Sequence, residues 1–315
     1  MIDDVTEAAN GLLRKGILAA ADSKHVNGLM SKHGMRLGAR RFVAGETLEE
    51  CITVLRGLNA RGLRVNTTVL GEGVLDEADA NRATSEYSDL IERLAVEEID
   101  GNVSLKLTHL GLAIDEELAL NNVNRLVALA GELGFFLRID MEESRWVDAT
   151  LEIYRRLVEI GHNNVGTALQ SYLKRTEADL EALLPVAPNL RIVKGAYLEP
   201  PELAFAEKSD VDAHYIALVE RMLEAGSFVA VATHDAEIIE HVIGVAERLG
   251  IEPAGRFEFQ MLYGVRAGLQ SRLLARGFPV LVGAPYGPEW YGYLMRRLAE
   301  RPANLGFLLK NLVRG

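Results

Sequence analysis

The sequence predicts an α/β fold, a closed (β/α)8 barrel of the TIM type preceded by an N-terminal helical arm. Two observations predict it: short β-branched or apolar runs recur eight times, and segments with helical periodicity separate them. The runs begin 22 to 40 residues apart, which leaves room for one strand, one helix and two loops each time. Eight such units favour a parallel barrel inside a ring of helices, with an open doubly wound sheet as the alternative.

The predicted strands are the runs at residues 63–70, 103–107, 135–140, 165–170, 190–194, 228–233, 257–261 and 279–283. Between them, residues 119–131 and 215–226 place Leu, Val and Met at intervals of three and four residues and end at a glycine. This spacing is typical of amphipathic helices that cover a sheet.

The first 62 residues stand outside the repeat and form the predicted arm, so the barrel domain is placed at residues 63–315. Residues 5–21 and 25–41 have helical patterns. Thr47-Leu48-Glu49-Glu50 is a capping box that opens a further helix before the first strand. The arm could cover the bottom of the barrel or mediate contact between subunits, and the sequence does not choose between these roles.

The composition narrows the class of protein. The 315 residues carry 34 Lys and Arg against 45 Asp and Glu, a net charge of −11, which argues against a nucleic-acid binder but leaves room for a local basic pocket. Cys51 is the only cysteine, so an internal disulfide and a cysteine metal cage are excluded. With no basic flank before an apolar run at the N-terminus and no apolar stretch of membrane-spanning length, we expect a cytoplasmic protein.

Polar residues collect where the predicted strands end, which is where barrels place their functional groups. These strand-end groups are Glu72, Lys106, Asp140, Glu142, Gln170, Lys194, Tyr197, Thr233, His234, Asp235 and Gln260. A barrel built for stability alone does not need them, because burying an unpaired charge is costly. For Glu142 and Asp235, taken singly, a solvated loop position is the simpler interpretation.

Three groups of cations suggest an anionic substrate or cofactor. Strand alternation places Ser104 and Lys106 on one face, and Asp140 on the next strand could pair with that lysine. Arg191 and Lys194 precede a Gly195-Ala196 corner that could admit a phosphate group. Arg296 and Arg297 follow the last strand on a helix, where they form either a solvated face or a fork for a small carboxylate.

Six longer stretches stand out, in order from the second strand to the last helix: VSLKLTHLGL (103–112), RIDMEES (138–144), LRIVKGAY (190–197), VATHD (231–235), FEFQMLYGVR (257–266) and WYGYLMRRLAERPAN (290–304). In these stretches the chain resembles the flavin-dependent proline dehydrogenase family. The resemblance covers residues from about 35 to the end, and the length suits the short, monofunctional form.

The resemblance implies roles for individual residues. Lys106, Arg296 and Arg297 bind the substrate carboxylate, with Asp140 supporting the lysine and the flavin site, and Glu72 acts as a gate that pairs with Arg296. Tyr197 and Leu262 pack around the substrate ring. The implied contacts of the noncovalent FAD are Met141, Gln170, Arg191, Lys194, Gly195, Ala196, Thr233 and His234.

The implied reaction is oxidation of L-proline to 1-pyrroline-5-carboxylate, with hydride transfer to the flavin and reoxidation by a membrane quinone. Arg191 is expected to stabilise the negative charge of the reduced flavin. The amphipathic segment 305–312 is either a packed helix or a peripheral membrane contact. Association into an oligomer stays open.

One position departs from the family pattern, and two other functions compete with the main one. Gly283 occupies the place of a tyrosine that lies against the substrate ring, so a substituted ring such as 4-hydroxyproline is an alternative substrate. A metal-dependent barrel hydrolase would need clustered ligands, but His109, His162, His234 and Asp140 lack such spacing, and we expect no metal. A non-catalytic binding barrel is the other alternative.

Overall fold

The computed structural model describes residues 39–300, with side chains up to residue 295. Its strands form a closed parallel barrel in chain order, in which the last strand pairs with the first. The strands are β1 (Arg64–Thr67), β2 (Gly101–Leu105), β3 (Phe136–Ile139), β4 (Val165–Gln170), β5 (Leu190–Val193), β6 (Val229–Ala232), β7 (Phe257–Leu262) and β8 (Val280–Gly283). Each overlaps one predicted run, so the predicted (β/α)8 barrel is confirmed and the open sheet is wrong.

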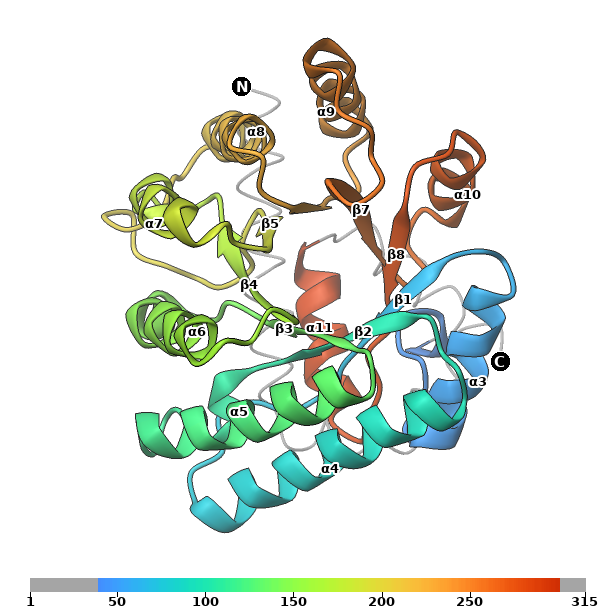
Figure 1. Ribbon diagram of the computed structural model, residues 1–315, viewed down its shortest axis with the longest axis vertical. Helices are drawn as coiled ribbons and strands as arrows, with labels where there is room; N and C mark the ends of the chain where they lie inside the picture. Colours follow the sequence, from blue (N-terminus) through green and yellow to red (C-terminus); the bar gives the residue numbers. More distant parts are fainter. Residues whose placement is uncertain (1–38, 301–315) are drawn as a thin grey trace.

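Helices surround the barrel (Figure 1). The α-helices are α3 (Leu48–Asn59), α4 (Glu77–Val96), α5 (Glu116–Glu132), α6 (Val147–Ile160), α7 (Thr176–Leu183), α8 (Lys208–Glu224), α9 (Ala236–Leu249), α10 (Ala267–Ala275) and α11 (Trp290–Glu300). Short 3-10 helices are η1 (Ala39–Arg41), η2 (Leu107–Leu110), η3 (Ser144–Trp146) and η4 (Leu184–Val186). The helices predicted at 119–131 and 215–226 are α5 and α8.

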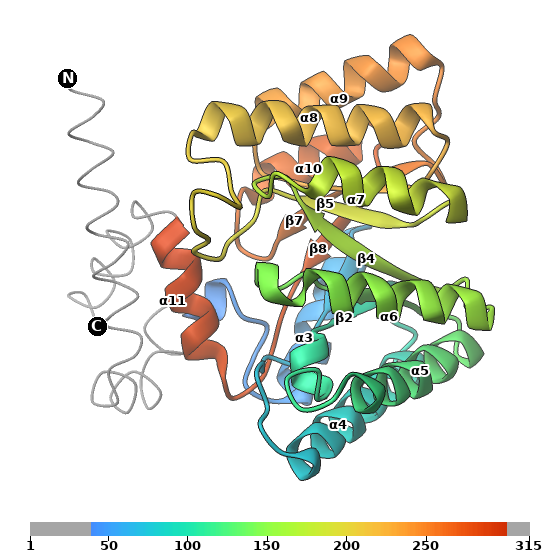
Figure 2. The ribbon, with the colours of Figure 1, turned by 90° about the vertical axis from the view of Figure 1, so that its left-hand side faces the viewer.

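The helix before β1, rather than the helix after β8, completes the ring. Helix α3 begins at the predicted cap, where Thr47 Oγ1 accepts from the Glu50 N–H at 3.3 Å. Its buried face, which includes Cys51 and Leu55, joins the main core beside β1. Helix α11 lies apart from the ring, across one end of the barrel (Figure 2). Because α11 follows β8 directly, this is the end where the strands terminate.

The described end of the predicted arm packs at this same end of the barrel. Ala39, Phe42 and Val43 form a second apolar cluster with Trp290 and Leu294 of α11. The indole Nε1 of Trp290 also donates to Glu46 Oε1 at 2.8 Å. These residues therefore do not cover the barrel's bottom. The helix predicted at 5–21 and most of the one at 25–41 lie outside the described residues, and the domain boundary at residue 62 stays a prediction.

The inner and outer faces of the barrel differ in polarity. On β7, Phe257 and Phe259 pack edge-to-face and both lie against Phe278, whereas Glu258 and Gln260 make polar contacts with residues of other strands. Alternation along a strand explains the division, because successive side chains point to opposite faces. The barrel thus holds an apolar layer under its helices and polar groups along its axis. Within residues 39–300, no helix has the length and apolar character to cross a membrane.

Candidate active site

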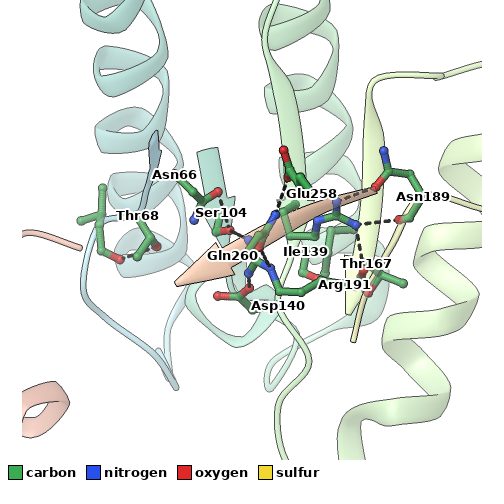
Figure 3. Close-up of polar contacts among 12 residues, drawn as sticks. Asn66, Thr68, Ser104, Ile139, Asp140, Thr167, Asn189, Arg191, Glu258 and Gln260 are labelled. Carbon is green, nitrogen blue, oxygen red and sulfur yellow. Dashed lines mark hydrogen bonds and ion pairs between the residues drawn. The ribbon is translucent and has the colours of Figure 1, made fainter. Parts of the chain in front are cut away.

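Arg191 is the centre of a polar network inside the barrel (Figure 3). Its side chain is 11% exposed. Nε donates to Gln260 Oε1 on β7 at 2.6 Å, and Nη1 donates to Asp140 Oδ1, directly after β3, at 2.6 Å. Nη2 donates to Ser104 Oγ on β2 at 3.2 Å. Since β2 and β5 are not neighbours, these bonds pass through the interior and place a fixed positive charge on the barrel axis.

Lys106 lies just beyond β2, and its partner differs from the expected one. Its Nζ is 4.0 Å from Glu72 Oε2, and its side chain is 14% exposed. The expected pairing of Lys106 with Asp140 is wrong, because Asp140 pairs with Arg191, which reaches it through the interior from β5. The lysine therefore lies beside the loop that carries Glu72, and the two cations have separate carboxylate partners.

Glu142 is a buried carboxylate, so its interpretation as a solvated loop residue is wrong. It is 4% exposed and accepts hydrogen bonds from the backbone N–H and the hydroxyl of Thr108. Burial raises the pKa of this carboxyl. The Glu142 carbonyl accepts from Gln170 Nε2 at 2.6 Å, while Thr108 Oγ1 accepts from the Gly73 N–H at 3.1 Å. Glu142 and Thr108 therefore connect the loop bearing Glu72 to Gln170 on β4.

Sequence reasoning did not identify Thr108 or Glu258 as members of the site network, and it listed Glu142 among the strand-end groups but interpreted it as a solvated loop residue. The only signal for Glu142 is its place directly behind a buried strand end. Thr108 lies two residues after Lys106, which is one of the strand-end groups. The roles of Thr108 and Glu142 depend on contacts between residues 34 positions apart, and that of Glu258 depends on a contact across 194 positions, which no local pattern reports.

Lys194 and Gly195 lie where β5 ends, as expected, and their contacts are specific. Lys194 Nζ forms ion pairs with Asp212 of α8 and with Asp235, the latter at 3.5 Å. Gly195 has φ +112°, and a Cβ there would overlap the ring of Tyr172. Only glycine permits both this backbone conformation and the close approach of the ring.

His234, Thr233 and Leu262 lie at the ends of β6 and β7. His234 Nε2 accepts from the Leu262 N–H at 2.9 Å, which assigns the ring proton to Nδ1. Thr233 is buried, and its Oγ1 accepts from the Asp235 N–H at 3.1 Å. Asp235 also caps α9 through the Glu237 N–H, so it is a structural as well as a charged group.

Gly283 faces the barrel interior. It pairs in register with Asn66 on β1 and with Leu262 on β7. Asn66 Oδ1 accepts from Ser104 Oγ inside the barrel, and neighbours in register lie on the same face of a sheet. A Cβ at Gly283 would meet its nearest atom, Leu262 Cδ2, at 3.5 Å, an ordinary van der Waals distance. The position therefore has space for a side chain.

The remaining expected residues fall into two groups. Met141 is buried behind β3, and Ala196 and Tyr197 are half-buried after β5, with roles that stay predictions. Arg296 and Arg297 belong to α11, but their side chains lie outside the described residues, as does the segment 305–312. Across the side chains that are described, no three His, Cys, Asp or Glu form a group suited to a metal ion.

The end of the barrel under α11 thus combines two cations, Arg191 and Lys106, with buried amides and apolar side chains. Such a site can orient an anionic group and stabilise negative charge that develops nearby, because its donors are held before a ligand binds. The same end carries a glycine corner and a further cation, Lys194, where β5 terminates, which suits a larger, phosphate-bearing ligand.

Comparisons with known proteins agree with this arrangement. The family model described as proline dehydrogenase matches residues 51–310. Proline dehydrogenase 1 of Bacillus subtilis (strain 168) is 39% identical over 303 residues, which are 96% of this chain and 100% of the relative. The proline dehydrogenase of Deinococcus radiodurans is 42% identical over 308 residues, which are 96% and 99% of the two chains.

The fold is also shared with a larger protein. The structure of proline utilization A (PutA) from Bdellovibrio bacteriovorus, inactivated by N-propargylglycine, matches with a TM-score of 0.80 and 25% identity. The match covers 92% of this chain but 36% of that one, so this chain spans about a third of PutA. From the family match along most of its length and its identity to monofunctional relatives, this chain belongs to the proline dehydrogenase family.

Proposed function

We propose that this enzyme oxidises L-proline to 1-pyrroline-5-carboxylate using noncovalently bound FAD and passes the electrons to a quinone. The observation that carries the proposal is the position of Arg191. Its guanidinium lies on the barrel axis with Asp140, Ser104 and Gln260 as partners. A fixed cation at this position stabilises the negative charge that a reduced flavin carries.

The described residues fit a flavin. Gln170 is 2% exposed, and its Oε1 is buried without a hydrogen-bond partner among the described residues, although its Nε2 is bound to Glu142. Because unsatisfied buried polar atoms are costly, this oxygen is an available acceptor for a ligand N–H. We assign Met141, Gln170, Arg191, Lys194, Gly195, Ala196, Thr233 and His234 to the FAD site.

The protein's contribution is to orient proline and to exclude water. Lys106, Arg296 and Arg297 hold the carboxylate, since several charge-assisted bonds fix both its position and its direction. Tyr197 and Leu262 lie against the ring, and Glu72 pairs with Arg296 when the substrate is enclosed. When bound, FAD supplies the acceptor for the hydride that leaves the ring carbon next to the deprotonated nitrogen.

The test is optical. Purified protein is expected to be yellow, and L-proline without oxygen is expected to bleach it. A colourless preparation would contradict the flavin assignment, and a yellow one that no cyclic amino acid bleaches would indicate a non-catalytic barrel. N-propargylglycine also combines a secondary amine with a carboxylate, so we expect it to inactivate this enzyme, as it inactivates the PutA of the solved structure.

We propose a substituted proline as the second candidate substrate because of Gly283. Its inner-face position and the free space beside Leu262 leave room for a substituent on the ring. An apolar pocket discriminates one small group by only about 1–3 kcal/mol. A 4-hydroxyproline activity would therefore accompany the proline activity rather than replace it.

A further inference from the structure

The side-chain amide of Gln260 holds Arg191 in place, and it can do so in only one of its two orientations. A glutamine side chain ends in an acceptor oxygen and a donor nitrogen of nearly equal size. Arg191 Nε–H can be satisfied only by the oxygen, and Gln260 presents it at 2.6 Å. A turned amide would face the guanidinium with its own N–H groups and repel it.

Glu258 determines which way the Gln260 amide points. Gln260 Nε2 donates to Glu258 Oε1 at 2.7 Å, and the two residues lie on the same face of β7, two positions apart. An ionised carboxylate only accepts hydrogen bonds, so the amide nitrogen must face Glu258 and the oxygen must face Arg191. The contact is visible in Figure 3, where Glu258, Gln260 and Arg191 follow one another.

The carboxylate of Glu258 is itself buried and paired with a cation. Glu258 is 3% exposed, and its second oxygen, Oε2, is 3.1 Å from Nη1 of Arg64 on β1. Arg64 is 41% exposed and also pairs with Asp100 at 3.0 Å. A buried charge is tolerated when it is paired and hydrogen-bonded, and Glu258 meets both conditions. A chain of contacts therefore leads from Arg64 through Glu258 and Gln260 to Arg191.

We propose that Glu258 is a positioning residue for the redox reaction: it orients Gln260, which holds Arg191 where its charge stabilises the reduced cofactor. The proposal rests on the proposed flavin function. Glu258 itself lies behind Gln260 and acts through it. Loss of the acceptor at position 258 lets the amide turn and Arg191 move. The reduction potential then falls, although a negative charge has been removed.

The direction of the change in reduction potential distinguishes a positioning role of Glu258 from a direct effect of its charge. If Glu258 acted only through its charge, its removal would favour the reduced cofactor and raise the potential, because electrons are added more easily where less negative charge is present. If Glu258 were only structural, the potential would stay constant while the protein unfolded more readily. Of the three roles, only positioning predicts a lower reduction potential in a folded, flavin-bound protein.

The experiment compares Glu258→Met with Glu258→Gln in the full-length, FAD-bound protein. For Glu258→Met, we expect the equilibrium constant for two-electron reduction to fall about ten-fold, a shift of about 30 mV to more negative potential. Anaerobic reduction at saturating proline slows by a similar factor of about ten, whereas KM changes little, because the carboxylate site is intact. Glu258→Gln keeps one acceptor oxygen, for which Gln260 Nε2 and Arg64 Nη1 compete, so we expect its losses to be smaller than those of Glu258→Met.

Three further variants keep the test decisive. Gln260→Met removes the acceptor of Arg191 directly and is expected to lower the potential as Glu258→Met does, even if the latter fails to fold. The double variant should then be no worse than either single one, because both act on one link. Asp100→Asn is the matched control, since it removes the other carboxylate partner of Arg64 without touching Gln260 and should keep the wild-type potential.

The outcomes separate this proposal from the proposed function. Wild-type protein that binds no flavin, or is not reduced by proline, overturns both. A working wild-type enzyme whose potential stays constant or rises in Glu258→Met and Gln260→Met overturns only the positioning role.

Discussion

Gly283 offers a test of substrate choice at a single position. We expect Gly283→Tyr to raise the ratio of kcat/KM for proline to that for 4-hydroxyproline, because the ring fills the space beside Leu262 and crowds a substituent. The expected change is about 1–3 kcal/mol, or roughly 5- to 150-fold in the ratio. Steady-state kinetics on both substrates measure it.

The control for this variant is Gly283→Ala, which adds a methyl group at ordinary contact distance and should change the ratio much less. An unchanged ratio in Gly283→Tyr would show that the position does not face the substrate.

His109 couples stability to pH. Its ring packs edge-on against Tyr87, and a Cβ at Gly71 would lie 2.4 Å from the ring, so the glycine lets the loop bearing Glu72 approach the histidine. Burial, and then the charge of Lys106, lower the pKa of His109 to about 4. The folded protein therefore favours the neutral ring, and this contribution to stability is complete above pH 6.5 and is lost as pH falls towards 4.

Between pH 7 and pH 5, we expect the free energy of unfolding of the wild type to fall by about 2 kcal/mol more than that of His109→Gln. Urea titrations at both pH values measure this difference, and comparison with the variant cancels the titration of other groups such as Glu142. The same comparison with His241→Gln, a change at an exposed histidine, provides the control. Parallel curves for the wild type and His109→Gln would refute the assignment.

At the scale of elements, side-chain caps mark where helices α3, α4, α5 and α9 begin. The Asp115 carboxylate accepts from the Leu118 N–H at 2.9 Å at the start of α5. We expect Asp115→Ala to lower the free energy of unfolding by about 1 kcal/mol, because a backbone donor loses its partner. Glu116→Ala, which removes an exposed acidic residue of the first turn but keeps the cap, should cost less in the same urea titrations. Equal losses would assign the effect to charge rather than to the cap.

Helix α3, which precedes β1, lies in the ring of helices, whereas helix α11, which follows β8, lies outside it. Helix α3 has an apolar face that joins the core beside β1, so it fills the ring position next to β8. Helix α11 contributes Trp290, Tyr291, Leu294 and Met295 to a separate cluster and lies over the barrel end (Figure 2). This displacement brings Arg296 and Arg297 to the same end as Arg191 and Lys106.

For the whole molecule, removal of the cofactor tests the proposed FAD site. A ligand that binds only the folded state stabilises it by mass action, and at a free concentration 100-fold above Kd the gain is about 2.7 kcal/mol. We expect flavin-stripped protein to unfold at a lower temperature and added FAD to restore the wild-type Tm. NAD, which shares the adenosine diphosphate portion of FAD, is the control. Equal stabilisation by NAD, or none by FAD, would contradict a specific flavin site.

The sequence by itself determined the barrel and much of the composition of its functional end. Strand-length runs at intervals of 22 to 40 residues predict the eight strands, and polar residues such as Lys106, Gln170 and His234 at their ends predict the functional end. The physical reason is local: periodicity decides strand or helix, and every carboxyl end in a parallel barrel meets at one edge.

Only the tertiary structure decided which charges are paired and which are buried. Asp140 is next to Lys106 in the strand order but pairs with Arg191, and Glu142 and Glu258 are buried although neither is singled out by its neighbours in sequence. Hydrogen bonds through the barrel interior join residues that are 51 and 194 positions apart in the sequence. The energy of a charge depends on these distances and on its separation from water, and both are properties of the closed barrel rather than of any segment of the chain.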